Sequence, residues 1–393
     1  MNLSACIGKW NATCHTTISD IPEAGWNNCA GNTDPFVRHQ HLRALEESGV
    51  VSPETGFSPR HVALWDDSGT IVAAAPAYLK THSKGELGID IGLMMAHERS
   101  VGPYYPKLQV EVPFTPISGS RLLIKQGVDS VTARTELIEI LMKQASECRA
   151  TSIQLSYISK DDDACVRQSG FIATEGNAYI WKGDGVNNFD EFLGKMQSSK
   201  RSKFLSERRK VAAFDLNFKT FSGKDISPDL ALKFFELYKS TFERNRTTPW
   251  LNSKYFEMVF ESMGNFFEIT VALKDESWMA AQLDVITSDI RFAQHWGHNG
   301  SIPFLLFEMG IYRTIEQAIM ADQNTINFGT TGLHKSERGI AMEPTHHAMW
   351  FVDPSFNEIA KLSLIRKSES ALQERLAGAE RLPFRRQPSN EKP

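Results

Sequence analysis

A carboxylate and a predicted helix start in the second half of the sequence could act on a carbonyl group. Residues 299–304 follow a predicted strand and open a predicted helix at 303–320. The start of a helix offers free N–H groups and a positive dipole end, which suit an anionic or carbonyl oxygen, although a plain turn explains the same pattern. Glu308 shares the apolar stripe of this helix with Phe304, so it is either a carboxylate paired with a cation or a base with a raised pKa.

A lysine stands in a loop rich in glycine and basic residues at 329–339. The loop lacks the GKS/T ending of a P-loop. Lys335 could instead stabilise the oxyanion that forms during acyl transfer, or simply lie in a solvated loop. His295, near the end of the strand before residue 299, is with Glu308 the candidate for proton removal. No Asp, Glu or Cys lies near His295 and His298, so no metal site is predicted.

Two further stretches have compositions typical of binding surfaces. Residues 195–210 carry seven Lys or Arg against one Glu, and a helix predicted at 195–213 would present them as a solvated or phosphate-binding face. Residues 98–116 combine aromatic, charged and proline residues without periodicity, which favours a binding segment. The candidate phosphate-binding residues are Lys200, Arg201, Lys203, Arg208 and Arg209. The candidate substrate-binding residues are Arg99, Tyr104, Tyr105, Lys107, Phe114, Trp250, Trp296, Phe304 and His334.

The composition excludes several classes of protein. Apolar residues make up 41% and charged residues 23% of the 393 residues, and a net charge of −4 argues against a DNA-binding protein. Five cysteines without a CxxC motif predict reduced thiols. No signal peptide or long apolar run is evident, so we expect a soluble cytoplasmic protein without membrane insertion. No GxSxG, HExxH, GxGxxG or GxxxxGK[ST] motif occurs.

The order of the predicted helices and strands repeats one α+β arrangement twice along the sequence. Each half has a helix, paired strands, a second helix and further strands, which predicts two related domains at 1–185 and 186–380. The basic helix at 195–213 opens the second domain, and a helix closes it. Residues 81–120 show little periodicity and are rich in glycine, proline and aromatic residues. The tail at 381–393 is basic and contains proline, and we expect it to be disordered.

Several blocks resemble bacterial peptidoglycan biosynthesis/recognition-type proteins, relatives of the Fem aminoacyltransferases in the GNAT superfamily. They include DPFVRHQHLRALEESG, GPYYPKLQVEVPFTPISGSRLL, HWGHNGSIPFLLFEMGIYRTIEQAI and FGTTGLHKSERG, within about residues 34–375. The resemblance implies two tandem GNAT-like domains, each a mixed sheet flanked by helices. It also implies transfer of an acyl or aminoacyl group to an amine, with Lys335 at the place of a lysine thought to stabilise the tetrahedral intermediate.

The donor and acceptor follow less directly from this resemblance. The stretch KRSKFLSERRKVAAF is similar to the basic helix of Fem-type enzymes, whose donor is aminoacyl-tRNA. The CoA loop Q/R-x-x-G-x-G/A is not evident in either half, so aminoacyl-tRNA is preferred to acyl-CoA as co-substrate, with no bound cofactor. The acceptor would be the amine of a small-molecule or peptide-like compound, in the cell wall or in natural product biosynthesis. The alternatives are a CoA-dependent N-acyltransferase and a non-catalytic binding protein for a cell-wall or peptide ligand.

Overall fold

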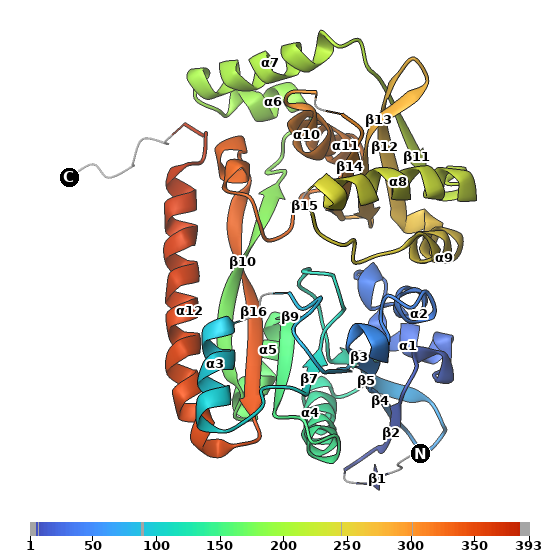
Figure 1. Cartoon of the computed structure of the whole chain (residues 1–393), viewed down its shortest axis with the longest axis vertical. Coiled ribbons are helices and arrows are strands. Elements are labelled where there is room, and N and C mark those ends of the chain that lie inside the picture. Colours follow the sequence, from blue (N-terminus) through green and yellow to red (C-terminus); the bar gives the residue numbers. More distant parts are fainter. Residues whose placement is uncertain (1–4, 7, 88–89, 245, 301, 386–393) are drawn as a thin grey trace, which may run out of the picture. The chain divides into compact units, whose positions relative to one another are not determined.

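The computed structural model describes residues 5–6, 8–87, 90–244, 246–300 and 302–385, and Figure 1 shows the course of the chain. The chain forms two compact units, each made of three segments. The first unit comprises residues 1–176, 250–262 and 344–372, and the second comprises 177–249, 263–343 and 373–393. The sequence predicts contiguous domains that meet at residue 185, and the structure departs from that division.

The first unit carries strands in two groups with α-helices packed on them. One sheet has the order β1-β2-β4-β5-β8, and a second row runs β16-β9-β7-β6-β3. The strands are β1 (Ala5–Cys6), β2 (Asn11–His15), β3 (Phe57–Pro59), β4 (His61–Trp65), β5 (Ile71–Ala75), β6 (Tyr78–Lys80), β7 (Lys107–Val110), β8 (Leu123–Ile124), β9 (Ser152–Ile158) and β16 (Ala341–Phe351). The helices are α1 (Glu23–Ala30), α2 (His39–Glu47), α3 (Ile91–Ser100), α4 (Ser130–Glu147), α5 (Lys160–Gln168), α9 (Ser253–Met263) and α12 (Pro354–Glu380).

Packing explains why two later segments join the first unit. The side chain of Asn252, just before α9, donates to the carbonyl of Ser48 at 2.9 Å. In α12, Phe356, Ala360 and Leu364 are buried in one cluster with Leu93 of α3. Periodicity along the sequence does not encode these long-range contacts, because each partner only supplies an ordinary apolar stripe or a polar cap.

The stretch at 81–120, predicted to lack regular structure, contains α3 and β7. The side chain of Asp90 caps α3 by accepting from the N–H of Leu93 at 2.9 Å. Only Leu93 and His97 of this helix are buried, so its apolar stripe is too sparse to stand out in the sequence. By contrast, the apolar residues at close helical spacing in 131–147 predict a helix. This helix is present as α4, and its apolar residues fill the core of the unit.

The second unit is built on a mostly antiparallel sheet with the order β11-β12-β13-β14-β15-β10. Its strands are β11 (Asn217–Ser222), β12 (Phe267–Lys274), β13 (Ser277–Ile286), β14 (Ile290–His298), β15 (Thr325–Asn327) and the end of β10 (Ile172–Lys182). Its helices are α6 (Phe189–Gly194), α7 (Ser198–Ala212), α8 (Pro228–Arg244), α10 (Leu305–Phe307) and α11 (Thr314–Met320), with a π-helical segment at Glu308–Arg313 between α10 and α11.

The helix predicted at 303–320 is present in the second unit, with two local differences. It begins at Leu305, because Phe304 has a left-handed backbone with φ of 68°. Its second turn is π-helical, a form that is rare and often marks functional positions. Ile311 and Ile315 are buried against Trp181 and Ile326 of the sheet, which holds the helix on one sheet face.

The tail predicted to be disordered at 381–393 is partly ordered. Residues 386–393 lie outside the described part of the chain. Before them, the N–H of Arg385 donates to the carbonyl of Lys195 at 3.1 Å, and Phe384 pairs with Met196 as a β-bridge. The prediction is wrong for these residues, because Phe384 is an apolar anchor that packs against Phe192 of α6. The predicted α+β class, with a mixed sheet and flanking helices in each unit, is confirmed.

Candidate active site

Lys335 lies in a short 3₁₀ helix, η7 (Leu333–Arg338), that follows β15. Gly332 and Gly339 flank the turn with φ of 109° and 82°, values that side chains with a Cβ rarely adopt. A Cβ at Gly339 would also stand 2.9 Å from the ring of Phe384. The glycines of this loop therefore shape a tight turn, as a phosphate cradle or an oxyanion site would require.

The amine of Lys335 is mostly enclosed and faces backbone carbonyls. Its Nζ donates to the carbonyl oxygens of Phe328 and of Thr331, the latter at 2.7 Å, and lies 5.4 Å from the ring centre of Tyr179. Burial lowers the pKa of Lys335 to about 8, because the charged ammonium loses hydration. An ammonium has three N–H donors, so one remains uncommitted among the described residues.

The amine of Lys335 lies near the point where two parallel strands, β14 and β15, cease to pair. β14 and β15 pair only between residues 290–292 and 325–327. Within the described chain, β14 continues to His298 without a partner strand on that side, while the chain leaves β15 at Phe328. Phe328 is the residue whose carbonyl accepts from Lys335. The candidate oxyanion donor therefore stands where the sheet opens.

The start of the 305–320 helix lies against η7, the short helix that carries Lys335. The ring of Phe307 is 5.3 Å from the ring of His334, and the guanidinium of Arg338 lies 3.6 Å from the centre of the Phe307 ring. Phe304 and Trp296 both pack on the small apolar cluster around Leu305. Three predicted substrate-binding residues of the second unit, namely Trp296, Phe304 and His334, thus surround the first turn of this helix.

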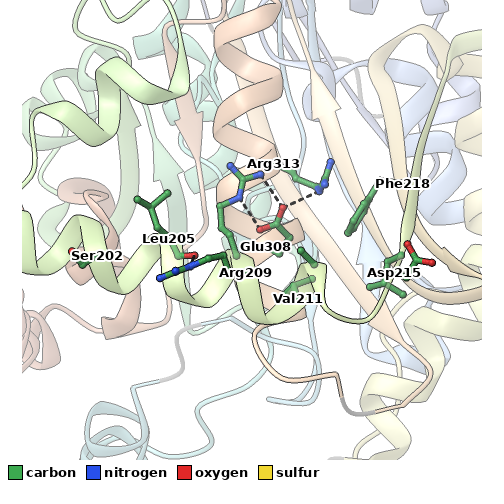
Figure 2. Close-up of a pocket in the computed structure, with 11 residues that line it drawn as sticks. Ser202, Leu205, Arg209, Val211, Asp215, Phe218, Glu308 and Arg313 are labelled. Atoms are coloured by element: carbon green, nitrogen blue, oxygen red, sulfur yellow. Dashed lines mark hydrogen bonds and ion pairs between the residues drawn. The ribbon is translucent and has the colours of Figure 1, made fainter.

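Glu308 lies on the far side of that turn, in an ion-pair network. Arg208 of α7 donates to both oxygens of Glu308 at 3.0 Å, and the Nε of Arg313 lies 3.1 Å from Oε1. Arg208 also donates to Glu316 at 2.6 Å. Both oxygens of Glu308 are therefore engaged, which is the paired-carboxylate alternative and not the free base. Figure 2 shows the ion pairs of Glu308, without Glu316, at the wall of a cavity that lies between α7, β11 and the helix. The volume of this cavity is about 710 Å³.

His295 is directed away from Glu308 and Lys335 by a β-bulge. The register between β13 and β14 shifts at Leu283, so one extra residue enters β14 before His295. His295 packs 5.2 Å from the ring of Tyr238 on α8, whereas its neighbour Trp296 packs towards Leu305. Burial lowers the pKa of His295 to about 4, so the ring is neutral at pH 7. The structure does not bring the three predicted catalytic residues together.

The basic helix α7 divides its charges between two roles. Phe204, Glu207 and Val211 form its buried face. Arg208 is held by Glu308 and Glu316, and the amine of Lys203 lies 3.3 Å from Glu337 in an exposed pair. Three predicted phosphate-binding residues remain without an ion-pair partner within the described chain: Lys200, Arg201 and Arg209.

The predicted binding segment of the first unit is mostly core. Tyr104 and Lys107 are buried, and the amine of Lys107 donates to Glu86 and to Gln154, the latter at 2.7 Å. Tyr105 donates its hydroxyl to Glu86 at 2.7 Å. Tyr104 and Lys107 are therefore part of the core of this unit, since all four residues of β7 are buried and the amine of Lys107 lies in a closed polar layer. The remaining residues differ: Arg99 is exposed on α3, and Phe114 stacks under the half-exposed Trp250 at 5.9 Å.

Sequence reasoning missed a buried set of polar residues next to Lys335. Arg338, Glu207 and Tyr312 bond to one another in the second unit. A signal was present: Glu207 is the one acid within a run of seven basic residues, and such a residue on the apolar side of a helix indicates a buried partner. Among the described residues, no group of three or more His, Cys, Asp or Glu side chains is arranged to hold a metal ion.

The family comparison covers almost the whole chain. Residues 17–386 match the FemAB-like family model, described as peptidoglycan biosynthesis/recognition. No curated protein sequence matches the chain. Similar solved structures include FemX, with 12% identity over 88% of this chain and 99% of that chain and a TM-score of 0.51. The C-terminal domain of a putative lysylphosphatidylglycerol synthetase from Agrobacterium fabrum has 10% identity over 87% and 96%, with a TM-score of 0.52. L-PGS from Bacillus licheniformis has 11% identity over 86% and 98%, with a TM-score of 0.50.

Fold and family together define the class of this protein. The structures just named share its fold, and at these identities they establish the fold alone. The chain belongs to the FemAB-like family of peptidoglycan biosynthesis/recognition proteins. The predicted resemblance to the Fem-type proteins is confirmed, and so is the predicted class of enzyme, an acyltransferase. None of the helices in the described regions has the length and apolar character needed to span a bilayer.

Proposed function

We propose that the protein transfers an aminoacyl group from aminoacyl-tRNA to the amine of a small-molecule or peptide-like acceptor. The acceptor nitrogen attacks the ester carbonyl, a C–N bond forms, and the bond to the ribose oxygen breaks. The proton released by the amine goes to the departing ribose oxygen, directly or through water. The products are an amide and uncharged tRNA.

The observation that carries the proposal is the geometry of the Lys335 amine. Two of its donors are fixed on the carbonyls of Phe328 and Thr331, which leaves the third for the oxygen that becomes negative in the tetrahedral intermediate. With a pKa of about 8, roughly nine tenths of these amines are charged at pH 7. A donor that is held in place and partly desolvated stabilises developing charge more strongly than a solvated one.

This mechanism does not require a side-chain base beside Lys335. Glu308 is engaged by two guanidinium groups, and His295 packs on α8. An aminoacyl ester is already an activated acyl donor, so positioning together with oxyanion stabilisation can supply most of the rate. The predicted roles of Glu308 and His295 in proton removal are therefore not part of the proposal.

Two features favour tRNA as the donor. α7 presents Lys200, Arg201 and Arg209 without ion-pair partners in the described chain, a positive surface suited to phosphates. The CoA loop motif is absent from the sequence. The family description supports an acceptor that belongs to peptidoglycan or resembles it. A charged tRNA donor also favours a cytoplasmic location.

A thermal-shift experiment separates the donors. The protein is heated with bulk charged tRNA, with uncharged tRNA, with acetyl-CoA and with CoA. We expect tRNA to raise the melting temperature, because a ligand that binds the native state alone stabilises it by about 2.7 kcal/mol at a hundred times its Kd. Stabilisation by CoA compounds and not by tRNA would refute the proposal that aminoacyl-tRNA is the donor. Transfer of a radiolabelled amino acid from tRNA to a pool of amines then tests the reaction.

A further inference from the structure

A closed ring of hydrogen bonds joins Arg338, Glu207 and Tyr312 in the second unit. The Nη2 of Arg338 donates to both oxygens of Glu207, at 3.0 and 2.8 Å. The hydroxyl of Tyr312 donates to Glu207 at 2.5 Å and accepts from the Nε of Arg338 at 3.0 Å. All three side chains are buried, with Tyr312 fully enclosed. Each charge in the set is therefore paired and hydrogen-bonded.

The three residues come from the three elements around Lys335. Arg338 is the last residue of η7, Glu207 lies on the buried face of α7, and Tyr312 lies in the π-helical segment. Arg338 also holds the other end of its own turn, since its Nη1 donates to the carbonyl of His334 at 3.1 Å. One guanidinium thus fastens the turn that carries Lys335 to α7 and to the helix.

A gain in folding stability does not by itself explain why the protein buries this hydrogen-bonded ion pair. Burying an ion pair removes both charges from water, so well-packed apolar residues often give the same or greater stability. A planar guanidinium fork accepts only a narrow range of partner positions, and a fully satisfied polar network favours one arrangement over near alternatives. The segment η7, which carries Lys335, needs such a fixed position, because a donor displaced by about 1 Å loses much of its effect on the reaction.

We infer that Arg338 is a positioning residue, which acts with Glu207 and Tyr312 to hold the η7 turn so that the Lys335 amine stays on the carbonyls of Phe328 and Thr331. The catalytic use of Lys335 rests on the proposed function. The position of its amine does not depend on the proposed function, and this position can be tested without a substrate.

The test follows the protonation of Lys335 in four variants: Arg338→Lys, Glu207→Gln, Tyr312→Phe and Arg291→Lys. Arg291→Lys is the matched control, because Arg291 is an equally buried arginine of the second unit whose partners, Asp284 at 2.9 Å and Glu268 at 2.6 Å, lie on β13 and β12. Folded protein is acetylated with trace acetic anhydride from pH 6 to 11. Mass spectrometry of the peptide that contains Lys335 gives its midpoint, since only the neutral amine reacts.

The wild-type midpoint is expected near 8. Loosening the turn exposes the amine to water, so the midpoint moves towards its ordinary value of about 10.4. Arg338→Lys and Glu207→Gln should raise it by at least about one pH unit, with a smaller rise in Tyr312→Phe and none in Arg291→Lys. An unchanged midpoint in the folded variants of Arg338 and Glu207, or an equal rise in Arg291→Lys, overturns the inference. If Arg338→Lys does not fold, Glu207→Gln and Tyr312→Phe decide it.

The reaction provides the second readout. In aminoacyl transfer from charged tRNA, Arg338→Lys should lower kcat at least about tenfold and leave KM for the tRNA unchanged, because the tRNA surface of α7 is intact. If Lys335→Ala transfers as fast as the wild type, the catalytic role given to Lys335 falls. The midpoint of Lys335 in the Arg338 and Glu207 variants then still decides whether these residues position it.

Discussion

Replacement of Lys335 by methionine should change how the stability of the protein depends on pH. The folded-state pKa of Lys335 is about 8, below the ordinary value of about 10.4, because burial disfavours the ammonium. Between these two values the unfolded chain binds more protons than the folded one, so the free energy of unfolding rises with pH in that window. Below pH 8 the amine is charged in both states and this gain is absent.

The size of the effect follows from the shift. From pH 7 to 9.5, a pKa near 8 in the folded state and near 10.4 in the unfolded state gives a gain of about 2 kcal/mol. Methionine has a similar length and no titrating group, so the Lys335→Met variant lacks this gain. It also loses the two hydrogen bonds to Phe328 and Thr331, which lowers stability at every pH.

Urea unfolding of both proteins between pH 6.5 and 9.5 provides the assay. Other titrating groups are common to the two proteins, so the difference between their free energies of unfolding isolates Lys335. We expect this difference to grow by about 2 kcal/mol in favour of the wild type as the pH rises. A difference that stays constant would show that the amine of Lys335 is hydrated in the folded state, and the reasoning about its burial would be refuted.

Three further predictions concern the second unit. Lys335→Ala should lower turnover in aminoacyl transfer at least about tenfold, roughly 1.4 kcal/mol, and an unchanged kcat would remove its assigned role. Arg208→Ala should destabilise by about 3 kcal/mol in urea unfolding because it leaves buried Glu308 with less compensation, whereas Arg209→Ala should leave stability unchanged and weaken tRNA binding in a filter assay. Gly297→Ala should unfold the unit at lower temperature in calorimetry, since its Cβ would stand 2.2 Å from the backbone of α8, and a wild-type melting temperature would contradict this contact.

Strong local patterns accounted for the elements that the sequence predicts well. The helix at α4 has apolar residues at close helical spacing, and Asp34 caps the turn at Pro35–Val37 through the N–H of Phe36, as the Asp-Pro pair indicates. α3 was missed because its stripe is sparse. The division into units was missed because it depends on packing between segments more than 200 residues apart, such as Asn252 with Ser48.

The candidate site shows the same limit. Lys335 is predicted from the composition of its loop and from a resemblance, but neither gives the contacts of its amine. That Glu308 is paired could be stated as an alternative, but its partner Arg208 stands 100 residues earlier and was assigned to phosphate instead. His295 was misplaced because one extra residue in β14 reverses the alternation, and no periodicity in the sequence reveals such a bulge. Predictions about side-chain direction fail where the backbone is irregular.

The three-segment composition of each unit has a consequence for biosynthesis. During translation the first unit still lacks β16 when residue 340 has been made, so the edge of β9 that pairs with 346–351 remains open. The apolar side chains that await α12, including Leu93 and Tyr104, are also uncovered at that stage. An unfinished sheet with an open edge is prone to mispairing. A nascent chain of this protein must therefore delay the completion of its first unit until residues 344–372 have left the ribosome.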